Sequence, residues 1–128
     1  MPYNPNSILR KSLDFKKDCD AIINEAKIFA EYLSKHDRDN RISALTSNQL
    51  RKFYGEVKRQ QLNGYDPVEF KLLKPKLAYA VGRNNNNKIS DFYSVMSDAI
   101  DNVSDKDSFD NFIKMFEAIV AYQKLFGK

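Results

Sequence analysis

The sequence predicts an all-α fold, a single compact bundle of about five helices that occupies residues 1–128 as one domain. Three observations predict it. Apolar residues recur three or four positions apart along nearly the whole chain, and no segment alternates apolar and polar residues over the length of a strand. The length of 128 residues, with 42% hydrophobic content, suits one domain with one core.

We expect the first helix to begin near Ser7 or Asp14 and to end near Lys35. The polar segment from Ser34 to Thr46 then predicts a loop. Cys19 lies on the apolar stripe of this helix, which favours a small core hydrophobe over a reactive thiol. The stripe consists of Phe15, Cys19, Ile22, Ala26, Phe29, Ala30 and Leu33.

The second helix is predicted to begin at a polar cap among residues 46–48 and to end at Asn63-Gly64. Its core side is Leu50, Phe53, Tyr54, Val57 and Gln61.

The third helix is predicted to begin with Asp66 as its cap and Pro67 at its first position. Pro75 predicts a kink or a break into two short helices, and Gly82 ends the segment. Asn84–Asn87 is the expected connector. The core side is Phe70, Leu73, Leu77, Ala80 and Val81.

The fourth helix spans about Ser90 to Val103, with its aspartates (Asp91, Asp98 and Asp101) on the side opposite its apolar stripe. The fifth, about Ser108 to Phe126, is apolar nearly all round. Such a helix is central in the bundle or partly covered by another subunit.

Catalytic and metal chemistry is not indicated. One histidine and one cysteine cannot supply a usual transition-metal site, and the four glycines form no phosphate-binding loop. The aspartates between Asp101 and Asp110 lack the glycine and closing glutamate of a calcium loop, which favours helix capping. We therefore expect a protein that is not an enzyme and needs no cofactor. With no secretory leader and no membrane-spanning run, we also expect it to be cytoplasmic.

The charge is concentrated in one third of the chain. The net charge is +4, but residues 41–83 carry nine Lys/Arg against three Asp/Glu, while residues 1–40 carry seven of each and residues 84–128 five against seven. Such segregation is typical of a surface that binds a polyanion. The alternative is a solvated face that happens to be basic.

In the second helix the basic residues Arg51, Lys52, Lys58 and Arg59 form two i,i+7 pairs opposite the core side. Gly55 lies among them. A glycine inside a helix costs about 1 kcal/mol relative to alanine. It either allows a phosphate backbone or another helix to approach, or it reflects drift on a solvent face.

In the third helix a second line contains Leu72, Lys76, Tyr79 and Arg83, with Lys74 nearby. Cations interleaved with a tyrosine suit RNA, although tyrosines at helical spacing are often core residues with a hydrated hydroxyl. No motif for reading bases is present, so we expect phosphate-directed binding that is independent of sequence.

Three segments together resemble the small subunit of the type III-A CRISPR effector, the Csm complex. They read LTSNQLRK (45–52), LLKPKLAYAVGR (72–83) and FEAIVAYQK (116–124), and the resemblance covers about residues 42–126. They are similar to that family's Thr-Ser-x-x-Leu/Ile-Arg helix start, its Tyr-x-Ala/Val-Gly-Arg helix end and its Glu-Ala-Leu/Ile-Val-Ala-Tyr C-terminal helix.

The resemblance implies a non-catalytic helical subunit, present in several copies along the backbone filament, that helps to hold guide (crRNA) and target RNA. Arg51, Arg83 and Lys124 lie where the motifs match. Two features depart from the family. Four asparagines follow Arg83 where the family usually has charged residues, and residues 1–40, the N-terminal helix and loop, match it least.

The function predicted is thus that of an RNA-binding structural subunit of a type III-A ribonucleoprotein. Its expected partners are guide and target RNA, the other effector subunits and further copies of itself, with no membrane. The alternative is a helical protein-interaction or dimerisation module whose basic third docks on an acidic protein. A helix-turn-helix DNA binder is disfavoured because no short turn precedes a recognition helix. The predicted RNA-binding residues are Arg51, Lys52, Lys58, Arg59, Lys74, Lys76, Tyr79, Arg83 and Lys124.

Overall fold

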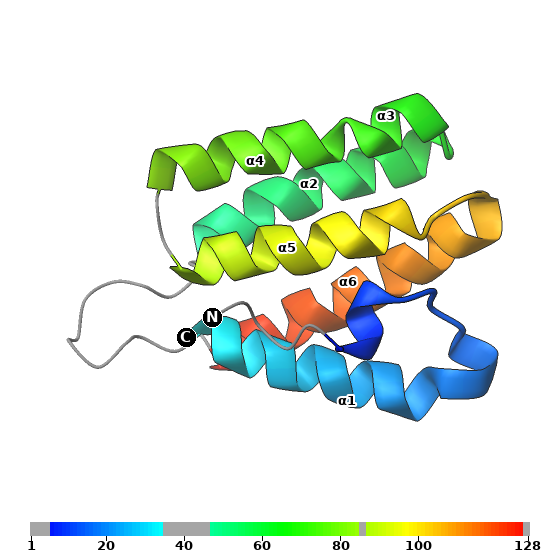
Figure 1. Cartoon of the computed structure of the whole chain (residues 1–128), viewed down its shortest axis with the longest axis horizontal. Helices are drawn as coiled ribbons and strands as arrows, with labels where there is room; N and C mark the ends of the chain where they lie inside the picture. The colour runs from blue at the N-terminus through cyan, green and yellow to red at the C-terminus, as the bar shows by residue number, and fades with distance from the viewer. Residues whose placement is uncertain (1–5, 35–46, 85–86, 127–128) are drawn as a thin grey trace.

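The computed structural model describes residues 6–34, 47–84 and 87–126, without the side chains of residues 47–49, 80, 81, 83, 84 and 87. These residues form a bundle of helices (Figure 1), and the all-α prediction is confirmed. The elements are the 3-10 turn η1 (Ile8–Arg10), α1 (Phe15–Ser34), α2 (Ser47–Asn63), α3 (Pro67–Lys71), α4 (Leu73–Asn84), α5 (Asn87–Asp101) and α6 (Lys106–Phe126). The loop expected between Ser34 and Thr46 and the middle of the asparagine connector lie outside the described residues.

Helix α6 is buried along most of its length, as expected for a helix with apolar residues nearly all round. Helices α1 and α2 both pack against it, while α5 packs against α4 and η1. Phe116 and Ile119 of α6 are fully buried. Helix α2 begins and α6 ends at the same end of the bundle, whereas α1 begins at the opposite end (Figure 1).

The start of α3 confirms the local prediction. The Asp66 carboxylate accepts hydrogen bonds from the backbone N–H groups of Val68 (2.9 Å) and Glu69 (3.2 Å), and Pro67 occupies the first helical turn. The segment breaks in two as expected, but at Leu72 rather than at Pro75. Pro75 lies in the first turn of α4, where its missing N–H removes no helical hydrogen bond.

Helix α2 ends as predicted, because Gly64 adopts a positive φ of 93° that favours glycine. Its core side is one position different from the expected one: Gln60 is buried and Gln61 is exposed. The Gln60 side chain donates a hydrogen bond to the Glu69 carbonyl (3.0 Å), so the packing of α3 on this side shifts the buried arc of α2.

The prediction of a core position for Cys19 is wrong, since its side chain is exposed. Asp18 has non-helical backbone angles (φ −118°, ψ 22°), and this kink breaks the register of the apolar stripe. The alternative start at Asp14 is confirmed, because its carboxylate accepts hydrogen bonds from the N–H groups of Lys16 and Lys17.

Helix α5 begins at Asn87, three residues earlier than expected, and Asp91 is buried rather than on a polar outer side. Its carboxylate accepts a hydrogen bond from the Tyr32 hydroxyl of α1. The other two aspartates of α5 have exposed side chains, and each pairs with a cation: Asp98 with Arg10 and Asp101 with Lys74. The hydrogen bond between Tyr32 and Asp91 therefore joins α1 to α5, in addition to the apolar packing of α1.

Candidate nucleic-acid interface

Helix α2 presents its basic residues on two sides rather than on one. Lys58 lies on the side that faces α6, where its Nζ is 3.1 Å from the carboxylate of Glu117. Arg51, two turns earlier, shares that side. Lys52 and Arg59 lie about 100° further round the helix, on the side nearer α4. The pair Arg51 and Lys58 therefore lies on the side that faces α6, whereas the pair Lys52 and Arg59 lies on the side nearer α4.

The side nearer α4 is an ion-pair network around one carboxylate. Glu56 pairs with Arg59 of the same helix and, at 2.8 Å, with Lys76 of α4. The hydrogen bond from the Arg59 guanidinium, followed by that from Lys76, lowers the pKa of Glu56 to about 2. The same contact with Glu56 raises the pKa of Arg59. Both cations are thus occupied by the protein's own negative charge.

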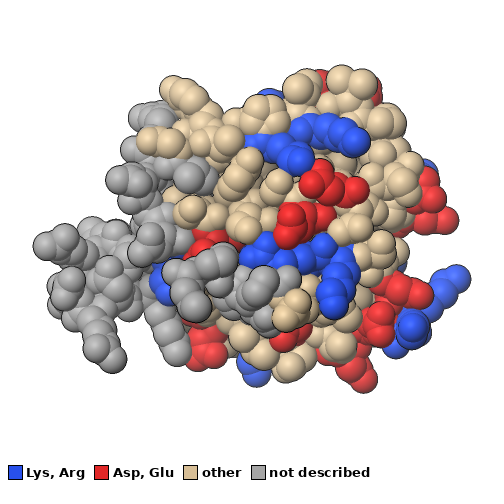
Figure 2. All heavy atoms as spheres, viewed as in Figure 1, with Lys and Arg blue, Asp and Glu red and all other residues tan. Residues whose placement is uncertain are grey.

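Two further cations are paired in the same way. The Lys74 Nζ lies 2.6 Å from Asp101 of α5, and this hydrogen bond raises the pKa of Lys74. The hydrogen bond to Glu117 likewise raises the pKa of Lys58. On the face that Figure 2 shows, basic and acidic side chains lie next to one another instead of separating into one basic area.

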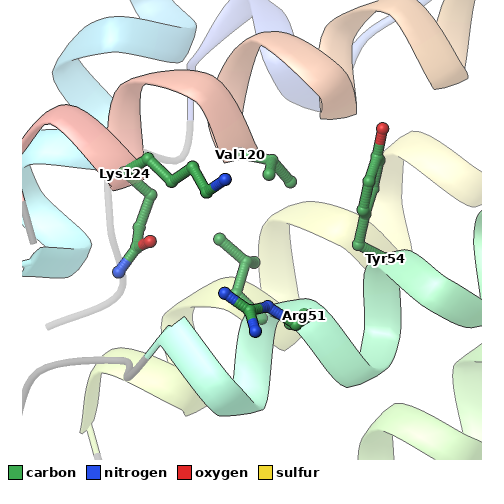
Figure 3. A pocket seen from close by; sticks show the side chains of 6 residues that line it. Arg51, Tyr54, Val120 and Lys124 are labelled. Atoms are coloured by element: carbon green, nitrogen blue, oxygen red, sulfur yellow. The ribbon is translucent and has the colours of Figure 1, made fainter.

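A hollow of about 200 Å³ opens between the first half of α2 and the last turns of α6. Arg51 and Lys124 stand on its two sides, with their charged ends over the space between the helices (Figure 3). Both side chains are exposed, and neither forms an ion pair with a carboxylate of the described residues. The hollow is lined by Leu50, Arg51, Tyr54, Val120, Gln123 and Lys124.

Aromatic packing places the two helices that form the hollow. Phe53 and Tyr54 of α2 both meet Phe116 of α6 edge to face, at centroid distances of 5.3 and 5.6 Å. The Tyr54 hydroxyl also donates to Glu117 Oε2 at 3.3 Å. Such aromatic pairs contribute about 0.5–1.5 kcal/mol beyond burial, so the wall beside Arg51 is held in place.

The remaining predicted residues lie elsewhere. Lys52 is exposed, and it too has no ion pair with a described carboxylate. Tyr79 is 69% exposed on α4 and does not line the hollow. The side chain of Arg83 lies outside the described residues. Of the nine residues, the structure therefore brings Arg51 and Lys124 together at the hollow, with Lys58 on the same side of α2, and Arg59 and Lys76 together at Glu56.

Four residues of the hollow were not predicted as site residues, and Leu50 was predicted as a core residue of the second helix. Tyr54 has the clearest sequence signal, because a tyrosine at the edge of an apolar stripe often keeps one part of its ring accessible. Val120 and Gln123 carry no such signal, since their position depends on how α6 meets α2.

Gly55 and the aspartates before α6 can also be placed. A methyl group in place of the Gly55 hydrogen would meet no atom of another described helix within 4 Å, so no other helix approaches Gly55 among the described residues. Asp105 caps α6: its carboxylate accepts from the backbone N–H of Ser108 (2.9 Å), which lowers its pKa. No group of three or more His, Cys, Asp or Glu side chains within the described ranges is arranged to hold a metal ion.

None of the described helices combines the length and the apolar character needed to cross a membrane. This holds for α6 as well, although apolar side chains surround most of it, because charged residues such as Lys114 and Glu117 interrupt it.

Comparison with known proteins identifies the family. A family model described as Csm2 Type III-A matches residues 16–128, further towards the N-terminus than the three motifs reach. The match includes almost all of α1, the helix that packs against α6. No curated protein and no solved structure matches the chain. The chain therefore belongs to the Csm2 family, the small helical subunit of the type III-A CRISPR effector, the Csm complex.

Proposed function

We propose that this subunit binds RNA in the Csm complex, without catalysing a reaction, through the surface around the α2–α6 hollow. The observation that supports the proposal is the meeting of Arg51 and Lys124 from two helices at one hollow, beside the Tyr54 ring. Guide and target RNA are the proposed ligands. The neighbouring effector subunits and further copies of the chain are the proposed protein partners.

The chemistry of the surface suits contact with phosphates. Two cations without a described carboxylate partner can each replace a counterion on the RNA backbone, and this release favours binding. Arg51 can hold a phosphate through two parallel N–H groups, while Lys124 acts as a point charge. Neither interaction reads a base, so the affinity depends on salt more than on sequence.

The test is a titration of labelled single-stranded RNA of unrelated sequence with the isolated protein at several salt concentrations. We expect Arg51→Ala with Lys124→Ala to weaken binding about tenfold or more near ~0.1 M salt, and to reduce the salt slope by about 1–1.5. The matched control is Lys16→Ala with Lys17→Ala, which removes two exposed charges at the opposite end of the bundle. If the two double variants bind alike, the hollow is not the RNA surface.

A contact with another protein is the second candidate function, and it concerns another surface. Val68 of α3 and Tyr79 of α4 are each 69% exposed, and Leu72 between them is 43% exposed. Their spacing of four and seven residues places them along the outer side of this segment. Val68→Glu with Tyr79→Glu should prevent incorporation into the complex, yet leave RNA binding by the isolated chain unchanged. Normal incorporation would rule this candidate out.

A further inference from the structure

We propose that the α2–α6 hollow receives one unstacked nucleotide of an RNA strand, with its base inside and its phosphates at the rim. The inference rests on the proposed function, since it names the part of the RNA that this surface takes. It adds a contact with the base to the contacts with the backbone.

The interior of the hollow is apolar, whereas its rim is charged. Leu50 is 2% exposed, and Val120 is half-buried on the facing helix. A surface that bound phosphates alone would gain nothing from an apolar recess between its cations. A nucleotide is itself divided in this way, with a flat base that stacks on apolar or aromatic groups and a charged backbone.

Tyr54 supplies an aromatic wall whose orientation is fixed before any ligand binds. Its ring meets Phe116 at 71°, and its hydroxyl donates to Glu117, so it is held at both ends. A ring held in this way loses little conformational freedom when a base packs against it. Tyr54 is half-buried and lines the hollow, which leaves part of the ring available to a ligand.

The size of the hollow limits the ligand. Its volume of about 200 Å³ is below the ~300–1,000 Å³ of pockets that enclose drug-sized molecules, and far above the ~30 Å³ share of one water molecule. A ligand of the size of a single base lies between these bounds. Bases inside a duplex are stacked on both sides and cannot enter, so single-stranded RNA is the form that suits the hollow.

The charges around the rim agree with a backbone that passes over the opening. Figure 3 shows Arg51 and Lys124 on either side of it, as two phosphates flanking an inserted base would require. Lys58, near the Tyr54 ring with its Nζ 5.8 Å from the ring centroid, is neutralised by Glu117. The available positive charge is therefore at the two sides of the hollow.

The experiment compares three RNA probes on the same protein: oligouridylate, a strand of equal length without bases, and a duplex. We expect the strand without bases to bind about tenfold more weakly than oligouridylate, which corresponds to about 1.4 kcal/mol. Val120→Trp, which fills the hollow, should bind oligouridylate only as tightly as the strand without bases, and keep its salt slope. The control Ala121→Trp adds the same ring at the exposed neighbouring position and should bind like the natural protein.

Far-UV circular dichroism verifies that Val120→Trp is folded, and Tyr54→Leu gives a second variant that removes the aromatic face without adding bulk. Equal binding of oligouridylate and the strand without bases would overturn the inference, as would equal binding by the two tryptophan variants. The proposed function would survive either result if Arg51→Ala with Lys124→Ala still weakens binding. The proposed function itself fails if Arg51→Ala with Lys124→Ala has no effect on RNA binding.

Discussion

Helix α2 contributes cations to two regions of the molecule that differ in what surrounds them. Beside the α2–α6 hollow, Arg51 faces Lys124 and apolar side chains, and no described carboxylate pairs with it. On the side nearer α4, Arg59 shares the carboxylate of Glu56 with Lys76. Each region contains three of the predicted cations, but two of them (Arg51 and Lys124) have no described carboxylate partner beside the hollow, against one (Lys52) on the side nearer α4. The number of basic residues in a segment therefore overstates the positive charge that a polyanion can use.

The two regions differ in degree in how readily their cations can bind a phosphate. Exposed ion pairs contribute about 0–1 kcal/mol in water, so a phosphate can compete with Glu56 or Asp101 for a lysine. When a phosphate takes the lysine, however, the carboxylate loses its partner and lies near the phosphate, which repels it. Paired cations should therefore contribute less to RNA binding than unpaired ones.

The largest expected effect concerns the packing behind the hollow. Phe116 is fully buried and supports both Phe53 and Tyr54. Phe116→Ala should lower the free energy of unfolding by about 3–5 kcal/mol, because it removes a large core side chain and leaves a cavity. Urea denaturation measures the change, with Leu125→Ala at a 55% exposed position as the control. A loss as small as that of the control would mean that the hollow has no fixed wall.

Release of a paired lysine next to the hollow should increase RNA affinity. Glu117→Gln removes the charge that holds Lys58, and one added phosphate contact at ~0.1 M salt corresponds to about fivefold tighter binding. Asp101→Asn makes the same change of charge but releases Lys74 of α4, which is not on the side of α2 that faces α6, and should alter affinity about twofold at most. Equal gains in the titration would show that net charge alone decides binding.

The Glu56 network should make stability depend on pH. The pKa of Glu56 is lowered from 4.5 to about 2, so its contribution is complete above pH 4.5 and is lost as the pH falls towards 2. Glu56→Gln should reduce the free energy of unfolding by about 1 kcal/mol at neutral pH. This reduction should become smaller as the pH falls from 4.5 towards 2. Urea denaturation of both proteins between these pH values measures the difference. A constant difference would contradict the assignment of the pairs to Glu56.

The smallest effect is expected from a paired cation far from the hollow. Lys74→Ala should change RNA affinity less than twofold, because Asp101 already neutralises this lysine. The same titration at ~0.1 M salt gives the value. A loss as large as that of Arg51→Ala would remove the distinction between the two regions.

Sequence reasoning succeeded where the cause is local. The cap at Asp66 with Pro67 behind it and the stop at Gly64 each depend on a few neighbouring residues, and each is found as predicted. It failed at Cys19, because the kink at Asp18 leaves no mark in the apolar spacing. It failed at Asp91, because a buried carboxylate needs a partner, and that partner, Tyr32, comes from a distant helix.

The candidate site divides in the same way. The motifs that resemble the Csm small subunit include Arg51 and Lys124, and the family match bears out that resemblance. Periodicity alone suggested one basic face on α2. It did not reveal that α4 and α6 approach that helix from two sides and bring Lys76 and Glu117 with them.

The sequence by itself determined the helices, some of their ends and the resemblance to the family, because spacing, caps and motifs are properties of neighbouring residues. Only the tertiary structure decided which cations remain available. Whether Lys58, Lys74 and Lys76 meet phosphate or carboxylate depends on which helices pack side by side, whereas the Arg59–Glu56 pair lies within α2 at a spacing of three residues. These three lysines lie within a few ångströms of carboxylates that are 20 to 59 positions away in the chain, and no local pattern encodes that proximity.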